Sequence, residues 1–182
     1  MNCYKCDISI KRKHLVRGYG NINAKIMLLG EAPGYYEDKF GIPFIGVSGK
    51  KLNEVLHLCN WTREEHVYIT NIIKCRPPGN RIPSELEINN CKDILQTEIE
   101  LVKPILIITL GATAFSSLTN VSLPMNQIRG KVLPLDSYTI IPTYHPSYIL
   151  RNPDIEHQFV SDFKKALYIY RTIINPVHTD NF

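Results

Sequence analysis

The stretch PILIITLGATAF, residues 104–115, decides the fold class of this chain. It is the longest apolar run, and a glycine separates its Ile- and Leu-rich half from a half of small and aromatic residues. At about a dozen residues it is shorter than the roughly 18 apolar residues that cross a bilayer. We therefore interpret it as a buried strand that enters a helix, and we expect no membrane segment.

The same alternation extends in both directions along the chain. Residues rich in Ile, Val, Leu or Tyr predict strands at 25–29, 66–71, 103–110 and 138–142. Helical patterns separate them at 49–58, from the capping box Ser84–Glu87 to about 101, at 111–118, and at 153–174 with Asn152 as N-cap. This alternation predicts a mostly parallel sheet that helices cover on both faces.

Length and composition are those of one globular domain. The 182 residues suit a single α/β domain over 1–182, and 44% hydrophobic with 21% charged residues is ordinary for a soluble protein. The first residues, MNCYKCDISIKRKH, lack the apolar core of a secretory signal. We therefore expect a cytoplasmic protein.

Positive charge gathers in two regions, although the net charge is only +4. One region is residues 11–17, and the other contains Lys74, Arg76 and Arg81 around a proline-rich turn. Both are candidates for contact with phosphates, and the alternative is a pair of solvated surface patches.

Four of the five cysteines form a pattern. Cys3 and Cys6 are a CxxC pair, and Cys75 and Cys91 follow far downstream. Four thiolates suit either tetrahedral zinc or an iron-sulfur cluster, and the spacing does not separate the two. Cys59 lies at helical spacing with apolar residues, so we expect it in the core.

Polar residues follow the expected strands. Glu31 and Glu37 come after the first strand, Asn71 ends the second, and His145 follows the fourth. In parallel sheets ligands bind beyond the carboxyl ends of the strands, so these four residues are expected to converge on one site. The glycine-rich stretch of residues 30–46 that carries both glutamates is not expected to form a regular helix.

Four motifs resemble the uracil-DNA glycosylase superfamily, and within it the iron-sulfur family 4 enzymes of bacteria and archaea. They are GEAPG with its continuation EDKFGIPFIG, then YITNIIKCRPPGNR, then Cys91 after a helix start, and finally HPSYILR. With the leading CxxC they span residues 3–151 in the family's order. The resemblance implies a three-layer α/β/α sandwich around a short, mostly parallel sheet of four strands. It also implies a structural [4Fe-4S] cluster on Cys3, Cys6, Cys75 and Cys91, with zinc as the alternative.

The resemblance also implies roles in binding a base that is flipped out of DNA. Phe44 would stack on the flipped uracil, with a core phenylalanine as the alternative interpretation. Asn71 would accept from uracil N3–H and donate to O4, which cytosine cannot match. Glu37 would occupy the space that the methyl group of thymine needs, and Tyr35 and Tyr36 are less favoured for that role.

Two residues are expected to act on the glycosidic bond. His145 matches the family's donor to uracil O2 as the base leaves. Glu31 is the first choice for orienting the attacking water. The better-known branch of the superfamily carries its aspartate one position later, where this chain has Ala32.

The motif HPSYILR is expected to contact DNA. Ile149 and Leu150 are candidates for an apolar wedge and Arg151 for a phosphate contact, and the alternative for the apolar pair is packing. The predicted protein is a monomeric, monofunctional uracil-DNA glycosylase of base excision repair that releases free uracil. The alternatives are a non-catalytic or covalent binder of uracil-DNA or single strands, and a metal-stapled redox protein.

Overall fold

A computed structural model describes residues 3–135 and 137–174. Its strands form one six-stranded sheet in the order β1-β3-β2-β4-β6-β5. The strands are β1 (Tyr19–Gly20), β2 (Ile26–Gly30), β3 (Val67–Asn71), β4 (Leu106–Leu110), β5 (Leu133–Leu135) and β6 (Tyr138–Thr143). The four central strands β3, β2, β4 and β6 are parallel, as the sequence predicted.

The expected count of four strands is wrong, because an antiparallel strand lies at each edge. β1 pairs with β3 and β5 pairs with β6. β1 has only two residues, and β5 contains Pro134, which has no backbone N–H to donate and is tolerated at an edge. Such short edge strands have too little apolar pattern to be detected from sequence.

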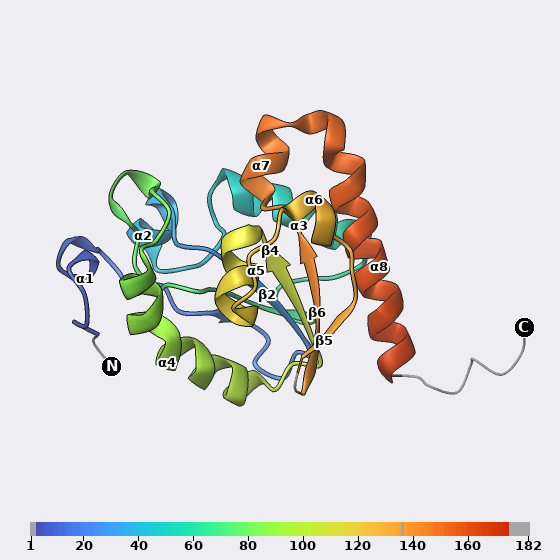
Figure 1. Ribbon diagram of the computed structural model, residues 1–182, viewed down its shortest axis with the longest axis horizontal. Helices are drawn as coiled ribbons and strands as arrows, with labels where there is room; N and C mark the ends of the chain where they lie inside the picture. The colour runs from blue at the N-terminus through green and yellow to red at the C-terminus, as the bar shows by residue number, and fades with distance from the viewer. Residues whose placement is uncertain (1–2, 136, 175–182) are drawn as a thin grey trace, which may run out of the picture.

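Helices cover both faces of the sheet, so the three-layer arrangement is confirmed (Figure 1). The helices are α1 (Ile8–Lys11), α2 (Tyr35–Phe40), α3 (Val47–Leu58), α4 (Glu85–Val102), α5 (Ala112–Thr119), α6 (Met125–Ile128), α7 (Pro146–Arg151) and α8 (Glu156–Ile174), with 3-10 turns at Pro78–Asn80 and Pro153–Ile155. One core cluster joins α3, α7 and α8 to the sheet, and a second joins α1, α4 and α5. A third, smaller cluster joins α5 and α6 to β6. Every residue of β2, β3 and β4 is buried, which fits strands covered on both sides.

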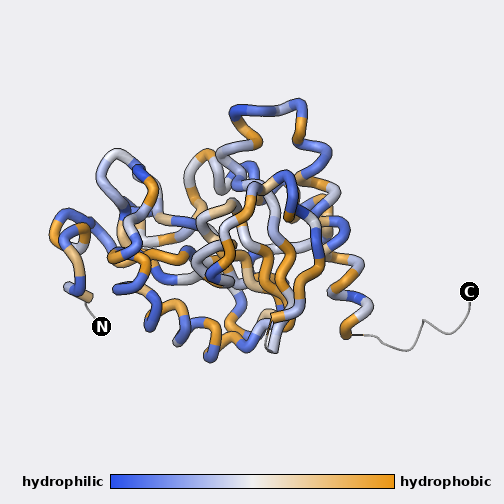
Figure 2. The backbone as a smooth tube through the Cα atoms, in the orientation of Figure 1, coloured by the Kyte–Doolittle hydropathy of each residue, from blue (hydrophilic) through white to orange (hydrophobic). Residues whose placement is uncertain are grey.

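Figure 2 shows the same separation, with apolar residues along the central strands and alternating polar and apolar residues along α4. The predicted capping box of α4 is present, because Ser84 Oγ accepts from the backbone of Glu87 and the Glu87 carboxylate accepts from the backbone of Ser84. Among the described residues no helix combines the length and apolarity that a membrane crossing requires.

Three local predictions need correction. The stretch 30–46 does contain a helix, the six-residue α2, which begins after Gly34 and ends at Gly41 in the left-handed conformation (φ 77°). The strand expected from residue 103 begins at Leu106, because Lys103 forms the left-handed C-cap of α4. Asn152 does not cap the next helix, and its amide donates to the carbonyl of Tyr148 instead.

Candidate active site at the carboxyl edge of the sheet

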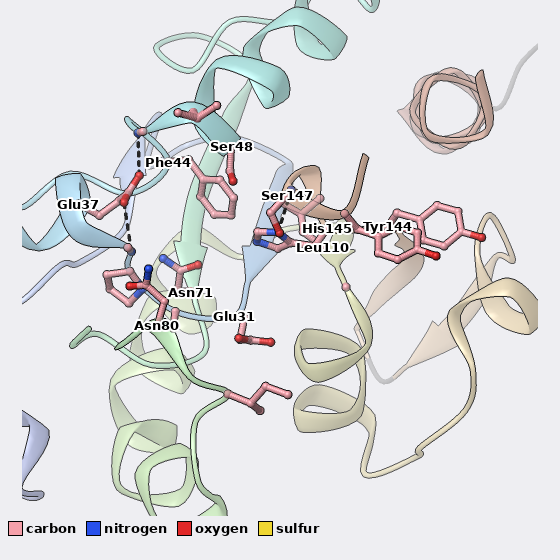
Figure 3. Close-up of a pocket in the computed structure, with 18 of the residues that line it drawn as sticks. Glu31, Glu37, Phe44, Ser48, Asn71, Asn80, Leu110, Tyr144, His145 and Ser147 are labelled. Atoms are coloured by element: carbon pink, nitrogen blue, oxygen red, sulfur yellow. Dashed lines mark hydrogen bonds between the residues drawn. The ribbon is translucent and has the colours of Figure 1, made fainter. Parts of the chain in front are cut away.

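A cavity of about 930 Å³ lies beyond the carboxyl ends of the parallel strands (Figure 3). Such a volume is typical of small-ligand sites. Asn71 ends β3, Glu31 follows β2, Gly111 follows β4 and His145 follows β6, and all four line the cavity. The tertiary structure therefore brings together the polar residues that the sequence placed after different strands.

Asn71 presents an unsatisfied acceptor at this cavity. Its side chain is 1% exposed, and Oδ1 has no hydrogen-bond partner among the described residues. The backbone carbonyl of Asn71 accepts from the ammonium of Lys74, which is completely buried. A buried acceptor without a partner costs about 1–3 kcal/mol, so its presence points to a donor supplied by a ligand.

Gly30 lets two site residues approach each other. It pairs with Asn71 in the register of β2 and β3. A Cβ atom at Gly30 would lie 2.4 Å from Asn71 Oδ1 and 2.5 Å from the ring of Phe44. Any other residue here would displace the amide or the ring, so the glycine is required by the site.

Phe44 forms an apolar wall of the cavity and is 5% exposed. Its ring centroid lies 5.8 Å from that of His145, with the planes inclined by 37°. The backbone of Phe44 has φ 53°, a conformation that bulky residues rarely adopt and that costs about 1–3 kcal/mol. Surrounding contacts must therefore hold this residue in place.

His145 is fixed in one tautomer by Ser147. The backbone N–H of Ser147 donates to Nδ1 of His145 at 3.1 Å, and the Ser147 hydroxyl is 2.7 Å from the same atom. Because Nδ1 accepts, the proton of the neutral ring is on Nε2. Burial, with a smaller contribution from the charge of Arg151, lowers the pKa of His145 to about 4. The ring is therefore a neutral hydrogen-bond donor at physiological pH.

The two glutamates have different environments. Glu31 lines the cavity, and its carboxylate makes no hydrogen bond or ion pair within residues 3–135 and 137–174 (Figure 3). Glu37 is buried, and its two oxygens accept from the backbone N–H groups of Gly34 at 3.1 Å and Gly46 at 2.8 Å. Glu31 is free to bind water, whereas Glu37 joins the two ends of the segment that carries Phe44.

The predicted DNA-contacting cations lie around the cavity. Arg81 and Arg151 line it, but Arg81 also forms a two-pronged ion pair with Glu87 at 2.6 and 2.8 Å. Arg76 is not part of the lining and lies over the ring of Tyr35, 5.2 Å from its centroid. Of these three cations, Arg76 and Arg151 have no carboxylate partner among the described residues.

The apolar wedge needs one correction. Ile149 is fully buried in a core cluster, because HPSYILR forms the helix α7 and turns this residue toward the sheet. Leu150 is 42% exposed on the same helix. Of the two predicted wedge residues, Leu150 alone remains a candidate.

The four patterned cysteines gather at one end of the molecule. Cys75 and Cys91 are buried in the same cluster, Cys6 packs against it, and Cys3 is near enough to Cys6 and Cys75 to influence their pKa values. Lys5 of the N-terminal arm forms an exposed ion pair of 2.7 Å with Asp93 of α4. Across residues 3–135 and 137–174, no three His, Cys, Asp or Glu side chains form a group suited to hold a metal ion. Cys59 is buried in the core cluster of α3 and α8, as predicted.

Sequence reasoning missed three residues that support the site. Ser147 sets the tautomer of His145, Lys74 holds the backbone of Asn71, and Arg63 binds the turn that carries Phe44. The position of Ser147 inside HPS was a usable signal. Lys74 was expected among the candidates for phosphate contact, and this expectation is wrong, because its ammonium is completely buried and paired with Glu98. Arg63 gave no signal, because charged residues are usually on the surface.

The sandwich and the cavity define an α/β protein with a candidate small-ligand site, lined by an amide, a neutral imidazole, a carboxylate and a phenyl ring. The model of the uracil DNA glycosylase superfamily matches residues 17–168, and the chain belongs to this superfamily.

Relatives of known type support this membership. The chain is 39% identical to the type-4 uracil-DNA glycosylase of Archaeoglobus fulgidus, over 91% of this chain and 86% of that protein. It is 40% identical to the type-4 enzyme of Saccharolobus solfataricus (99% and 86%) and 39% identical to that of Thermotoga maritima (90% and 87%). The resemblance to family 4 noted from the motifs is thereby confirmed.

Proposed function

We propose that this protein excises uracil from DNA by hydrolysing the N-glycosidic bond, the first step of base excision repair. The observation that carries the proposal is the buried, unpartnered Oδ1 of Asn71 next to the ring of Phe44. An apolar ring beside an unsatisfied acceptor suits a flat base with an N–H on its edge. The alternative of a non-catalytic binder is not favoured, because the similar proteins are named as glycosylases.

Selection of uracil follows from the hydrogen-bonding groups of Asn71. Oδ1 accepts from uracil N3–H, and Nδ2 donates to O4. Cytosine offers an acceptor at N3 and a donor at C4, so both of its groups would face the wrong partner. In a dry cavity such a mismatch leaves polar groups unpaired and discriminates strongly.

Exclusion of thymine is assigned to the wall that contains Glu37. Its carboxylate is held by Gly34 and Gly46, so it forms a fixed part of the cavity lining. A fixed wall beside C5 of the base leaves no room for a methyl group. Glu37 therefore acts through its position, with both oxygens occupied by the backbone.

His145 stabilises the leaving base. As the bond between N1 and C1′ breaks, its electron pair moves onto the uracil, and negative charge develops on N1 and O2. The neutral ring of His145 offers Nε2–H to O2, because Nδ1 is already an acceptor. A fixed donor of this kind is worth about 3 kcal/mol of transition-state stabilisation.

Glu31 orients the water that completes the reaction. The water oxygen attacks C1′ of the sugar, and its proton passes to the carboxylate. The products are an abasic site and free uracil, which takes up a proton from solvent. Glu31 suits this role because it lines the cavity and its carboxylate has no partner among the described residues.

The base must leave the duplex to enter this cavity, at a cost of a few kcal/mol. We assign Leu150, which is exposed on α7, to the gap in the stack, and Arg151, Arg76 and Arg81 to contacts with phosphates. Of the three, Arg81 already forms an ion pair with Glu87, so less of its positive charge is available to a phosphate.

Cys3, Cys6, Cys75 and Cys91 would hold a [4Fe-4S] cluster. Cys75 and Cys91 lie in one core cluster with Cys6 packed against it, and thiolate is the ligand that each iron of such a cluster takes. Zinc is the alternative, since it accepts the same four sulfur ligands. When bound, the cluster would anchor the arm of residues 3–13 beside the DNA-facing segments.

We further propose that residues 1–182 act as one domain and as a monomer, in the compartment that holds the genome, which in a prokaryote is the cytoplasm. The activity is tested by incubating the protein with a uracil-containing oligonucleotide and then with alkali, which cleaves abasic sites. We expect cleavage at uracil by the wild-type protein, and a rate about 100-fold lower for His145→Ala. Intact DNA in a stable complex with the wild-type protein would refute the proposal.

A further inference from the structure

Arg63 is a buried cation in the turn before β3, and the charge is not neutralised by a bonded carboxylate. Its side chain is 9% exposed, and it is in none of the ion pairs among the described residues. Burial lowers the pKa of Arg63, as expected for a charge removed from water. Buried charges are costly unless other groups satisfy them, so the role of this guanidinium requires an explanation.

The guanidinium is satisfied by the turn that carries Phe44. Nη1 donates to the carbonyl of Pro43 at 2.9 Å, and Nη2 donates to the carbonyls of Phe44 and, at 3.3 Å, of Gly49. Nε donates to Oδ1 of Asn53 at 2.7 Å. One side chain therefore ties together both sides of the turn and the first half of α3.

These bonds lie on both sides of Phe44, a bulky residue of the cavity wall with a positive φ. The carbonyl of Pro43 belongs to the peptide before Phe44, and the carbonyl of Phe44 belongs to the peptide after it. Fixing both peptides fixes φ and ψ of Phe44, whose φ of 53° is unfavourable for a bulky side chain. Gly49 allows α3 to approach the turn this closely, because a Cβ atom at residue 49 would lie 1.6 Å from the Phe44 carbonyl oxygen.

Helix stability alone does not favour this arrangement. A cation beside the first turn of α3 faces the positive end of the helix dipole. An apolar side chain of similar volume would cover the same surface without the loss of hydration. An arginine offers what an apolar residue lacks, which is several N–H donors in a rigid fork.

We propose that Arg63 is a positioning residue for base stacking. By holding Phe44 in its left-handed conformation, it keeps the ring against the space beside Asn71 where the flipped base binds. The inference rests on the proposed function, because the stacking partner is the excised uracil. Arg63 itself does not line the cavity and acts only through Phe44.

A double-mutant cycle tests this role, with inhibition by free uracil as the readout. Arg63→Lys keeps the charge but cannot reach the three carbonyls together. We expect Arg63→Lys and Phe44→Leu each to weaken uracil inhibition about tenfold, in line with the contribution of one stacking contact. Because both act through the same ring, the double variant should be no more than about threefold weaker than Phe44→Leu alone. A loss near 100-fold, the product of the two, would overturn the proposal.

The control is Phe163→Leu, which opens a cavity in the same core cluster from α8 and leaves the hydrogen bonds of Arg63 in place. It should lower the melting temperature and leave uracil inhibition within about twofold of wild type. An equal loss of inhibition in this control would mean that general destabilisation explains the effect, and would overturn the proposal.

Hydrogen exchange provides a readout that does not depend on activity. In Arg63→Lys the amides of residues 44–49 should exchange at least about tenfold faster, whereas Phe163→Leu should leave their rates relative to the rest of the core unchanged. If the wild-type protein releases no uracil, the proposed function fails. Unchanged exchange in the turn would instead refute the role of Arg63.

Discussion

The backbone N–H of Ser147 donates to Nδ1 of His145 at 3.1 Å, so the imidazole can present only Nε2–H to the cavity. His145 and Ser147 lie on either side of Pro146, and their contact thus decides which ring nitrogen of His145 faces the cavity. Because burial also lowers the pKa of His145 to about 4, this donor stays neutral throughout the physiological range.

The first prediction concerns the pH dependence of excision. His145 is neutral in the folded protein above about pH 4, so kcat/KM should show no inflection near the ordinary histidine value of 6.5. The measurement is single-turnover excision from pH 5 to 8. An inflection near 6.5 that disappears in His145→Asn would contradict the assignment.

The same shift has a consequence for stability. An unfolded chain binds a proton at His145 below about pH 6.5, whereas the folded protein does so only near pH 4. Stability from this residue is therefore complete above about pH 6.5 and is lost as the pH falls toward 4. Denaturant unfolding at pH 5 and pH 7 should show a smaller difference for His145→Asn than for the wild-type protein.

The second prediction concerns the choice of base. In Asn71→Asp the donor Nδ2–H₂ is replaced by an acceptor, which suits the amino group of cytosine. We expect the preference for uracil over cytosine to fall at least about tenfold, together with a loss of activity on uracil. Asn71→Ala is the matched control, because it should lose activity without gaining cytosine. Wild-type selectivity in the Asn71→Asp protein would show that Asn71 does not read the base.

The third prediction concerns the buried pair Lys74–Glu98. The ammonium donates to Thr70 Oγ1, the Asn71 carbonyl and Glu98 Oε2, so all three of its protons are used. Glu98→Ala leaves a buried charge without its partner, and we expect a loss of about 3–5 kcal/mol in the free energy of unfolding. Calorimetry or denaturant titration measures it.

The control for this pair is Glu54→Ala on the surface of α3. It removes one of two carboxylates bonded to Lys51, and Glu156 remains in contact with the ammonium. Its effect on the melting temperature should be small, because exposed ion pairs contribute little. Equal effects of the two variants would mean that Lys74 and Glu98 are not coupled as the structure indicates.

The fourth prediction concerns phosphate contacts. Arg76 has its guanidinium over Tyr35 and no acidic partner among the described residues. Arg76→Gln should lower the slope of log K against log salt by about one, since one phosphate contact is lost. Lys164→Gln, on α8, should leave the slope unchanged. If both variants leave it unchanged, Arg76 does not bind a phosphate.

The fifth prediction concerns the cysteines. The wild-type protein purified without oxygen should be brown and contain iron, and Cys75→Ser should lose both the visible absorbance and thermal stability. Cys59→Ala, which changes a buried cysteine in the core cluster of α3 and α8, should keep the colour. Metal analysis separates the alternatives, because a colourless protein with one equivalent of zinc would exclude the cluster.

Much of the framework was predictable from sequence because it depends on local patterns. The apolar runs identified the four parallel strands, and Ser84 with Glu87 correctly marked the start of α4. Residues after strand ends met at one cavity because parallel strands share their carboxyl edge. The edge strands and α7 were missed, since two or three residues of strand and one and a half turns of helix carry too weak a periodicity.

The sequence by itself determined the α/β class, the family, and which residue types gather at the carboxyl edge. Only the tertiary structure decided that Ile149 belongs to the core, that both oxygens of Glu37 are occupied, and that Arg63 holds Phe44. The reason is physical. Strand and helix patterns are set by neighbours along the chain, whereas burial, tautomer and hydrogen-bond partners are set by groups that are distant in sequence and meet only when the chain folds.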